Sequence, residues 1–344
     1  MRKITKNIFP LEWNLSDDLV VSKSDLKVFG TFVCGGGSTM GYKLAGFNHI
    51  GGVEFTEHYS RVYKKNHNPK YFYTEDIRDF NKREDLPSEL YDLDLLDGSP
   101  PCAAFSTVGA REKVWGKKSK YEDKSQVKDD LVFIYCDTIK KLKPKTFILE
   151  NVSGLTKGNA KSYLHRIIKR MSKTYNVQAF LIKASDVGIP QMRQRVFIIG
   201  SRKDLNFGKL NLEFDCPKVG FDCTKKFWDI EEPNLDIRNY AIYKQWKETE
   251  IGKSHEKRFS LCKPYLNKPC YTITEKSSNQ SAASVCHPIK PRKLNGKEVS
   301  LLSTFPMDYN FLDVTPSSVM GRSVLPVVMA NISYQIRKQW FENE

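Results

Sequence analysis

The sequence predicts an α/β fold in which a mostly parallel sheet carries helices on both faces, together with a smaller second domain. From about residue 26 to residue 200, short apolar runs alternate with amphipathic stretches, the pattern of parallel strands joined by helices. After Gly200 the chain becomes rich in Lys, Asn, Asp and aromatic residues with little periodicity. A length of 344 residues suits one large domain with a smaller insert.

The strands and helices follow from the apolar pattern. Six apolar runs, each followed by polar or glycine residues, are predicted as strands: Lys27 to Val33, His49 to Glu54, Leu93 to Asp97, Thr146 to Glu150, Gln178 to Lys183 and Arg195 to Gly200. Four amphipathic stretches are predicted as helices: Thr39 to Ala45, Glu57 to Asn66, Leu131 to Leu142 and Ala160 to Tyr175. The expected division is a first domain of residues 1–200 completed by 312–344, a second domain of residues 201–290, and a hinge at residues 291–311.

The composition favours a polyanionic partner and a cytoplasmic protein. A formal charge of +15 attracts nucleic acid, although basic charge alone is weak support for such a function. The chain has no uninterrupted apolar run of about 18 residues and no signal-peptide pattern, so we expect no membrane segment. Its eight cysteines form no CxxC pair, which favours reduced thiols and no metal site.

A glycine cluster at Phe32 to Gly41 lies between a predicted strand and a predicted helix. Glycines there let the backbone approach a ligand, as in nucleotide-binding folds. Glu54 follows 19 residues after Gly35 at the end of the next strand, where an acid can bind a ribose, and Asp76 is placed to bind an adenine amino group. The pattern fits adenosine-containing cofactors generally, including those of a nicotinamide oxidoreductase.

A second candidate site, Asp97-Gly98-Ser99-Pro100-Pro101-Cys102, ends an apolar strand. In open α/β sheets, ligands bind outside the carboxyl ends of the strands, and two rigid prolines there can present a thiol to the ligand. The alternative is a buried cysteine that acts as a small apolar residue. We interpret Cys102 as a nucleophile.

Charged residues follow or begin two further strands. Glu150 directly follows an apolar strand and enters the same crevice if that strand neighbours the Cys102 strand. Further along, Arg193 and Arg195 alternate at the start of a strand, after Gln191, and so share a face. Such a pair suits an anion or a pyrimidine carbonyl, although a solvated charge pair would give the same pattern.

Taken in order, these segments resemble the cytosine-5 DNA methyltransferase family of prokaryotic or phage type, from about Lys27 to the C-terminus. The matches are Val33 to Gly41, Glu54, Asp76-Ile77, Pro100-Pro101-Cys102, Glu150-Asn151-Val152, Gln191-x-Arg193-x-Arg195, Lys268 to Thr274 and Gly321 to Val324. Three positions depart from the family pattern: Val33 where an aromatic residue stacks on the cofactor, Ala103 in place of Gln, and Arg322 in place of Asn.

The resemblance implies a Rossmann-like fold that binds S-adenosylmethionine and needs no metal. Cys102 would add to carbon 6 of cytosine, a protonated Glu150 would hydrogen-bond ring nitrogen 3 and the amino group, Arg195 would contact the carbonyl, and Arg193 would assist orientation. The implied cofactor-binding residues are Val33, Gly35, Gly37, Glu54, Phe55, Asp76, Ile77, Pro100 and Ser323.

The resemblance also implies double-stranded DNA as the substrate, with the target cytosine flipped out of the helix. Implied DNA contacts are Ser106, Arg111 and Lys113 in the loop after Cys102, together with Gln191 and Arg238, and the segment after Gly200 would be the target-recognition domain. A cognate restriction endonuclease is an expected partner. Two alternatives stay open, a tRNA-methylating member of the same fold and a catalytically silent DNA-binding homologue, whereas the Pro-Pro-Cys element argues against an oxidoreductase.

Overall fold

A computed structural model of the chain describes residues 3–18, 21–101 and 131–342. These residues form a seven-stranded sheet in the order β3-β2-β1-β4-β5-β7-β6. The strands are β1 Lys27–Thr31, β2 Asn48–Val53, β3 Tyr71–Tyr73, β4 Leu95–Gly98, β5 Thr146–Val152, β6 Tyr175–Lys183 and β7 Gln194–Arg202. All neighbouring pairs are parallel except that β7 runs antiparallel to both β5 and β6. The predicted α/β fold with a mostly parallel sheet is therefore confirmed.

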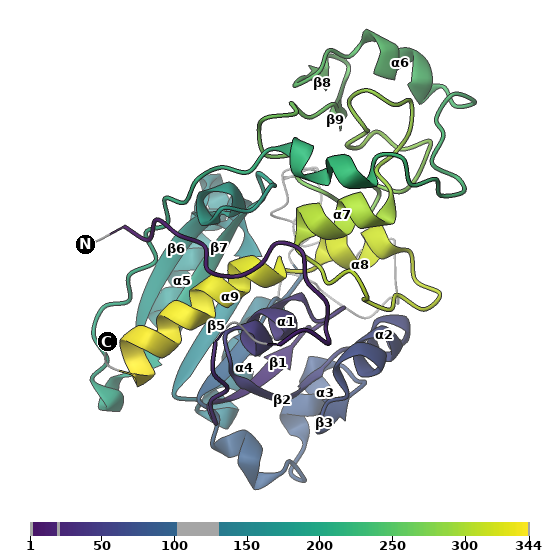
Figure 1. Ribbon diagram of the computed structural model, residues 1–344. Helices are drawn as coiled ribbons and strands as arrows, with labels where there is room; N and C mark the ends of the chain where they lie inside the picture. The colour runs from purple at the N-terminus through teal and green to yellow at the C-terminus, as the bar shows by residue number, and fades with distance from the viewer. Residues whose placement is uncertain (1–2, 19–20, 102–130, 343–344) are drawn as a thin grey trace.

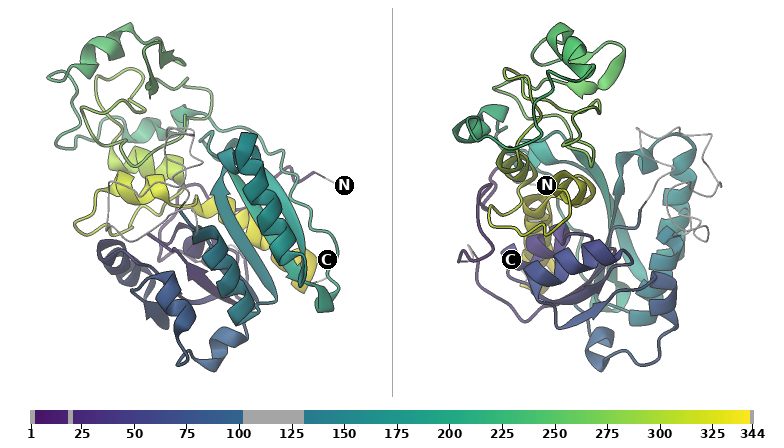
Figure 2. Two further views of the ribbon diagram at one scale, coloured as in Figure 1. Left: turned by 180° about the vertical axis from the view of Figure 1, so that it is seen from behind. Right: turned by 90° about the vertical axis from the view of Figure 1, so that its right-hand side faces the viewer.

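Helices cover both faces of this sheet (Figures 1 and 2). One face carries α1 Gly37–Leu44, α2 Glu57–His67 and α9 Pro326–Ile336, whose buried side chains belong to one apolar cluster. The other face carries α3 Ile77–Lys82, α4 Leu131–Leu142 and α5 Lys161–Met171, which share a second cluster. No helix in the described ranges is long and apolar enough to cross a membrane.

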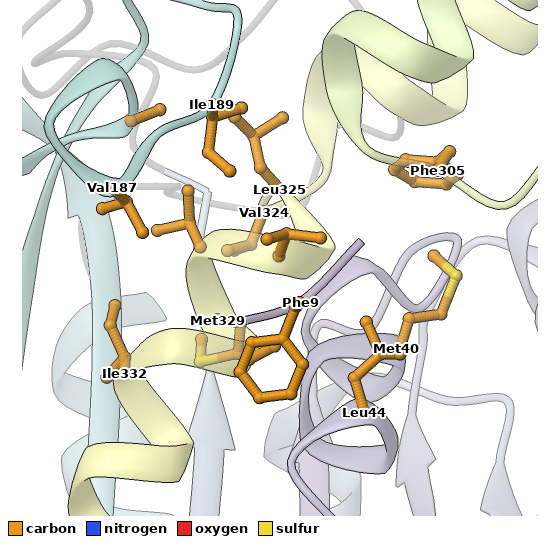
Figure 3. Close-up of a cluster of buried hydrophobic side chains, with 14 of the residues drawn as sticks. Phe9, Met40, Leu44, Val187, Ile189, Phe305, Val324, Leu325, Met329 and Ile332 are labelled. Carbon is orange, nitrogen blue, oxygen red and sulfur yellow. The ribbon is translucent and has the colours of Figure 1, made fainter. Parts of the chain in front are cut away.

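The first cluster joins the two ends of the chain (Figure 3). Met40 and Leu44 of α1 pack in the same core as Met329 and Ile332 of α9. Gly41 allows this close approach, because a Cβ built there would lie 2.5 Å from Cβ of Met329. Helix α1 is thereby held against the C-terminal helix, and its first residues are fixed at the carboxyl end of β1.

Several predicted boundaries were wrong for identifiable reasons. Strand β1 ends at Thr31, before the predicted Val33, because Phe32 has φ of 56°, outside the extended region. The helix predicted to reach Tyr175 ends at Met171, and Tyr175 instead opens β6 with its hydroxyl donating to the carbonyl of Pro144 at 2.9 Å. The short elements β3 and α3 were not predicted.

Above the carboxyl end of the sheet lies a smaller body (Figure 1). It contains α6 Ile242–Glu248, β8 Ser254–His255 and β9 Arg258–Cys262, around a core of Ile237, Ile242, Trp246, Leu261 and Cys286. Residues 206–216 do not belong to this core. Leu210 and Leu212 are buried in the first apolar cluster of the sheet, and the side chain of Gln178 on β6 hydrogen-bonds the backbone of Leu210.

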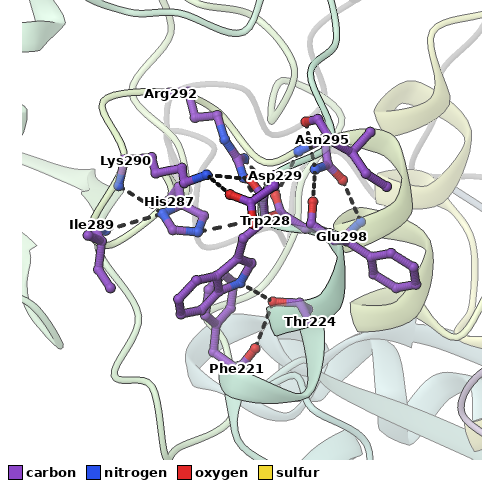
Figure 4. A network of polar contacts seen from close by, with 12 residues as sticks. Phe221, Thr224, Trp228, Asp229, His287, Ile289, Lys290, Arg292, Asn295 and Glu298 are labelled. Atoms are coloured by element: carbon purple, nitrogen blue, oxygen red, sulfur yellow. Dashed lines mark hydrogen bonds and ion pairs between the residues drawn. The ribbon is translucent and has the colours of Figure 1, made fainter.

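A polar network fixes the smaller body to α7 Gly296–Ser303, which with α8 Pro316–Arg322 leads back to the sheet (Figure 4). Asn295 and Glu298 form a capping box at the start of α7, each accepting from the backbone N–H of the other. The fully buried carboxylate of Glu298 also accepts two hydrogen bonds from Arg292, both 2.8 Å long. This paired geometry holds the junction in one arrangement.

Candidate functional site

A cavity of about 310 Å³ lies at the carboxyl ends of β1, β2, β4 and β5. Loops that are far apart in the sequence meet there because parallel strands end at the same edge of the sheet. Eleven of the residues predicted for the site line this cavity: Val33, Gly37, Glu54, Phe55, Asp76, Ile77, Pro100, Glu150, Arg193, Arg195 and Ser323. Ser323, which the family resemblance implied, comes from the C-terminal segment, so residues from both ends of the chain meet in this cavity.

The glycine loop is held in an unusual backbone conformation around Glu54. Phe32 and Cys34 have φ of 56° and 47°, in the left-handed region that glycine tolerates best. The buried Glu54 carboxylate accepts from the backbone N–H groups of Cys34 and Thr56, each at 2.8 Å. Burial raises the pKa of Glu54, while these hydrogen bonds oppose the shift. Glu54 thus fixes the loop that faces the cavity.

Gly35 does not line the cavity. Its carbonyl accepts a hydrogen bond from the hydroxyl of Tyr309, and a Cβ built on it would lie 2.1 Å from a methyl carbon of Val319. Gly35 is needed for close packing between the glycine loop and the C-terminal segment. This packing role differs from the cofactor contact that was predicted.

The aromatic residue that the glycine loop was expected to lack is present one position earlier. Phe32 lines the cavity beside Val33, and Phe55, whose exposed fraction is 51%, offers a second ring at its edge. The signal missed was Phe32 itself, which the sequence pattern assigned to the strand.

Asp76 caps α3 by accepting from the N–H of Arg78 at 2.8 Å, and it also pairs with the Arg78 guanidinium at 3.1 Å.

Glu150 and Arg195 both line the cavity and form an ion pair there. Nε of Arg195 lies 3.0 Å from Oε1 of Glu150, across the antiparallel pairing of β7 with β5. Burial raises the pKa of Glu150, and the charges of Arg195 and Arg193 act in the opposite direction. The pair therefore holds a buried carboxyl group that can carry a proton more readily than an ordinary glutamate.

Asn151 connects this pair to the Pro-Pro turn. Its side-chain amide donates to the carbonyl of Pro100 at 3.2 Å, so β5 positions the turn that leads to Cys102. The predicted nucleophile Cys102 and the predicted DNA contacts Ser106, Arg111 and Lys113 lie outside the described residues.

Asp97 is a cavity residue that had no assigned role. It is the third residue of β4, and its Oδ1 accepts from the hydroxyl of Tyr42 on α1 at 3.0 Å. Burial raises its pKa to about 7, the Tyr42 hydrogen bond opposes the rise, and the nearby Glu150 adds to it. A buried acid between the glycine loop and the Pro-Pro turn could have been suspected from its place at the end of an apolar strand.

Arg193 and Gln191 have structural contacts that were not predicted. The buried guanidinium of Arg193 donates to the carbonyls of Ile273, Gly321 and Ser323, at 3.3, 3.0 and 3.1 Å. Burial, with Arg195 in the same direction, lowers its pKa to about 9. The fully buried Gln191 donates to the carbonyl of Leu302 at 3.0 Å and accepts from the N–H of Ile273 at 3.1 Å. Gln191 therefore holds these segments together, and its predicted contact with DNA stays a prediction.

Two further predicted or departing residues lie toward the smaller body. Arg238 is exposed and pairs with Asp236, so its guanidinium is at the surface of that body. Arg322 lines the cavity and its Nε lies 2.7 Å from Oε2 of Glu275. Within the described part of the chain, no group of three or more His, Cys, Asp or Glu residues is arranged to hold a metal ion.

The fold and the cavity define an α/β protein with a ligand site at the carboxyl ends of its parallel strands. The family described as C-5 cytosine-specific DNA methylase matches residues 26–338, so the chain belongs to this family.

Similar proteins include two curated type II methyltransferases. M.FnuDI of Fusobacterium nucleatum is 33% identical over 61% of this chain and 57% of its own length. M.NgoPII of Neisseria gonorrhoeae is 31% identical over 63% of this chain and 58% of its own length. The chain therefore matches less than three fifths of the length of these two relatives. Among solved structures, a prophage-encoded methyltransferase of E. coli has a TM-score of 0.69 at 19% identity, covering 93% of this chain and 100% of that one, a likeness of fold.

Proposed function

We propose that this protein transfers a methyl group from S-adenosylmethionine to carbon 5 of a cytosine in duplex DNA. The observation that carries the proposal is the buried Glu150–Arg195 pair, which lies in one cavity with the glycine loop and the Pro-Pro turn before Cys102. An adenosine-containing ligand in this cavity lies directly beside a carboxyl group and a guanidinium, the two groups that recognise a cytosine edge. Membership of the C-5 cytosine-specific DNA methylase family supports the same chemistry.

The cavity residues fit the cofactor. Phe32, Val33 and Phe55 supply apolar surface for the adenine ring, and the Glu54 carboxylate is available to the ribose hydroxyls in addition to its two backbone partners. Asp76 also lines the cavity, and its carboxylate suits the adenine amino group as an acceptor. When bound, S-adenosylmethionine supplies an electrophilic methyl group. Val33, Gly37, Ile77, Pro100 and Ser323 complete the proposed cofactor surface.

The protein residues activate the cytosine. The Cys102 thiolate forms a bond to carbon 6, and the ring electrons that this bond displaces make carbon 5 nucleophilic. Protonated Glu150 donates to ring nitrogen 3 and stabilises the negative charge that develops there. Arg195 donates to the cytosine carbonyl. After carbon 5 has accepted the methyl group, a base takes its proton and the Cys102–carbon 6 bond breaks, which restores the aromatic ring and the thiolate.

The proton on Glu150 follows from its surroundings. Burial favours the neutral carboxyl, whereas the nearby Arg195 guanidinium favours the carboxylate. When the pyrimidine carbonyl takes hydrogen bonds from Arg195 and the base displaces water, the balance moves toward the neutral acid. Arg193 acts through its carbonyl contacts with Gly321 and Ser323, which hold the C-terminal wall of the cavity.

The smaller body around Trp246 and Leu261 is proposed as the target-recognition domain, within the region of residues 201–290, and Arg238 is a proposed DNA contact on its surface. Residues 291–311 would be the hinge, and residues 1–200 with 312–344 the catalytic domain. Double-stranded DNA is the proposed substrate and a cognate restriction endonuclease a proposed partner.

Bisulfite sequencing of DNA from a bacterial host that lacks cytosine methylation and expresses the protein tests this function. The expected result is full protection of one cytosine in a short recurring sequence, lost in the Cys102→Ser variant. Methylation of tRNA with none in DNA would instead support the tRNA alternative, and no methyl transfer to either would support a silent DNA-binding homologue.

A further inference from the structure

A long segment of the chain carries positive charge without any acid. Residues 151–185 contain no Asp or Glu, whereas the average composition of the chain would place about four there. The same segment contains seven Lys and Arg residues: Lys157, Lys161, Arg166, Lys169, Arg170, Lys173 and Lys183. The segment begins with the last two residues of β5 and contains the whole of α5 and of β6. The charge is therefore concentrated on and around α5.

Five exposed polar side chains recur at intervals of four residues within α5 and at its two ends. Lys157, Lys161, His165, Lys169 and Lys173 are each four residues apart, and all five are exposed. Lys161, His165 and Lys169 lie within α5, where residues four apart form a ridge with successive members about 6 Å apart along the axis, whereas Lys157 precedes the helix and Lys173 follows it. We call these five residues the α5 row. Helix α5 covers the outer side of the sheet opposite α9, and in the view from behind it lies in front of the strands (Figure 2).

The stability of α5 explains only part of this row. Helix N-termini favour negative charge, yet α5 begins with Lys161 and has no acid in its first turn. Lys169 lies in the last turn, where the helix dipole favours a cation, but Lys161 in the first turn has no such role. Of the cations on α5, Arg170 alone pairs with an acid among the described residues, Asp137 of α4. Helix stability therefore accounts for Lys169 but not for Lys161, and an external anion would offset the unfavourable charge at the first turn.

The row begins beside the cavity. Val152, the last residue of β5, lines the cavity, and Lys157 follows only five residues later, before the first turn of α5. We propose that the α5 row is a second, sequence-independent binding surface for the phosphate backbone of duplex DNA. This inference rests on the proposed function, because DNA held at the cavity brings its own flanking phosphates to this side of the protein. DNA carries about one negative charge per 1.7 Å of helix axis, a density that suits a row of lysines.

The test compares two triple variants with the same net charge. The first is Lys161→Gln, Lys169→Gln and Lys173→Gln. The control is Lys6→Gln, Lys23→Gln and Lys209→Gln, three exposed lysines outside α5. The probe is a labelled 40-base-pair duplex of random sequence, and its Kd is measured by fluorescence anisotropy over a range of salt concentrations. We expect the row variant to raise Kd roughly tenfold at 0.1 M salt and to lower the salt slope by about 0.9 per lysine removed, with the control changed less than twofold.

Equal effects of the two triple variants would overturn the inference. The inference would also be overturned if the row variant lost affinity for a polyglutamate peptide but kept its affinity for DNA. The partner of the row would then be an acidic protein. Thermal melting of both variants checks the fold. Methyl transfer to plasmid DNA at saturating concentration separates this inference from the proposed function: a wild-type protein that methylates no DNA refutes the function, whereas an active protein whose row variant binds random duplex as tightly as the control refutes only the row.

Discussion

Arg195 and Glu150 form a buried ion pair across two antiparallel strands, with Nε of the arginine 3.0 Å from Oε1 of the glutamate. Glu150 is followed by Asn151, whose side chain hydrogen-bonds the carbonyl of Pro100 in the Pro-Pro turn. Arg195 lies two residues after Arg193, which hydrogen-bonds the carbonyl of Gly321 in the C-terminal wall of the cavity. The pair therefore connects the strand edge to both sides of the cavity. Substitutions can separate the chemical role of the pair from the structural role of its neighbours.

Glu150→Gln should abolish most of the activity without unfolding the protein. The amide keeps the size of the side chain, but it cannot donate a carboxylic proton to ring nitrogen 3, so we expect kcat to fall by about 10²- to 10³-fold. Transfer of a tritiated methyl group to plasmid DNA measures the rate. A variant with wild-type kcat would remove Glu150 from the mechanism.

Arg193→Met and Arg195→Met should differ in what they damage. Loss of Arg193 leaves three buried carbonyls without their donors, and we expect the free energy of unfolding to fall by about 3 kcal/mol. Loss of Arg195 leaves Glu150, which can accept a proton, so stability should fall less while kcat falls by about 10²-fold. Urea unfolding and methyl-transfer rates at low temperature distinguish them. Equal losses of stability and rate in both variants would contradict this division.

Cys34→Gly should stabilise the protein. Cys34 has φ of 47°, a conformation that costs a side-chain-bearing residue about 1 to 2 kcal/mol, part of which glycine returns as entropy of the unfolded chain. We expect a net gain of up to about 1 kcal/mol and a rise in Tm of a few degrees. Cys34→Ala is the matched control, since it removes the thiol but keeps the strain. A gain in Cys34→Ala equal to that in Cys34→Gly would rule out backbone strain as the cause.

Asp97→Asn should change how stability depends on pH. The pKa of Asp97 rises from 3.8 to about 7 in the folded protein, so the folded state binds the extra proton between these values. Its favourable contribution is complete below about pH 4 and is lost as the pH rises through about 7. The variant keeps an oxygen acceptor for Tyr42 and never ionises. The Tm of the variant relative to that of the wild type should therefore rise as the pH increases from 4 to 8. A difference in Tm that does not change with pH would contradict a shifted pKa at Asp97.

The sequence predicted the elements whose apolar pattern is strong. The strands that begin at Lys27, Thr146 and near Arg195, and the helix Leu131–Leu142, lie where periodicity predicted them. Boundaries failed where a single residue leaves the regular backbone, as Phe32 does, or where a long-range contact decides, as it does for Tyr175. Elements of three to six residues such as β3 and α3 are too short for a pattern to develop.

The roles of buried polar residues could not be predicted from local sequence. Gln191 and Arg193 were placed near the site correctly, but their partners, Leu302, Ile273 and Gly321, are 80 or more residues away in the chain. A buried carbonyl gives no signal in the sequence, so an arginine that serves three of them is indistinguishable from one that awaits a ligand. The return of Leu210 and Leu212 to the sheet core is likewise a tertiary contact inside a segment without periodicity.

The most direct test of the account is covalent trapping on the pyrimidine. Plasmid DNA grown with 5-fluoro-2′-deoxycytidine has a fluorine at carbon 5 that no base can remove, so the bond between protein and carbon 6 persists after methyl transfer. We predict a denaturation-resistant protein–DNA complex that requires S-adenosylmethionine, with mass spectrometry placing the modification on Cys102. A protein that binds both ligands yet forms no such adduct, or an adduct at another residue, would contradict the central claim.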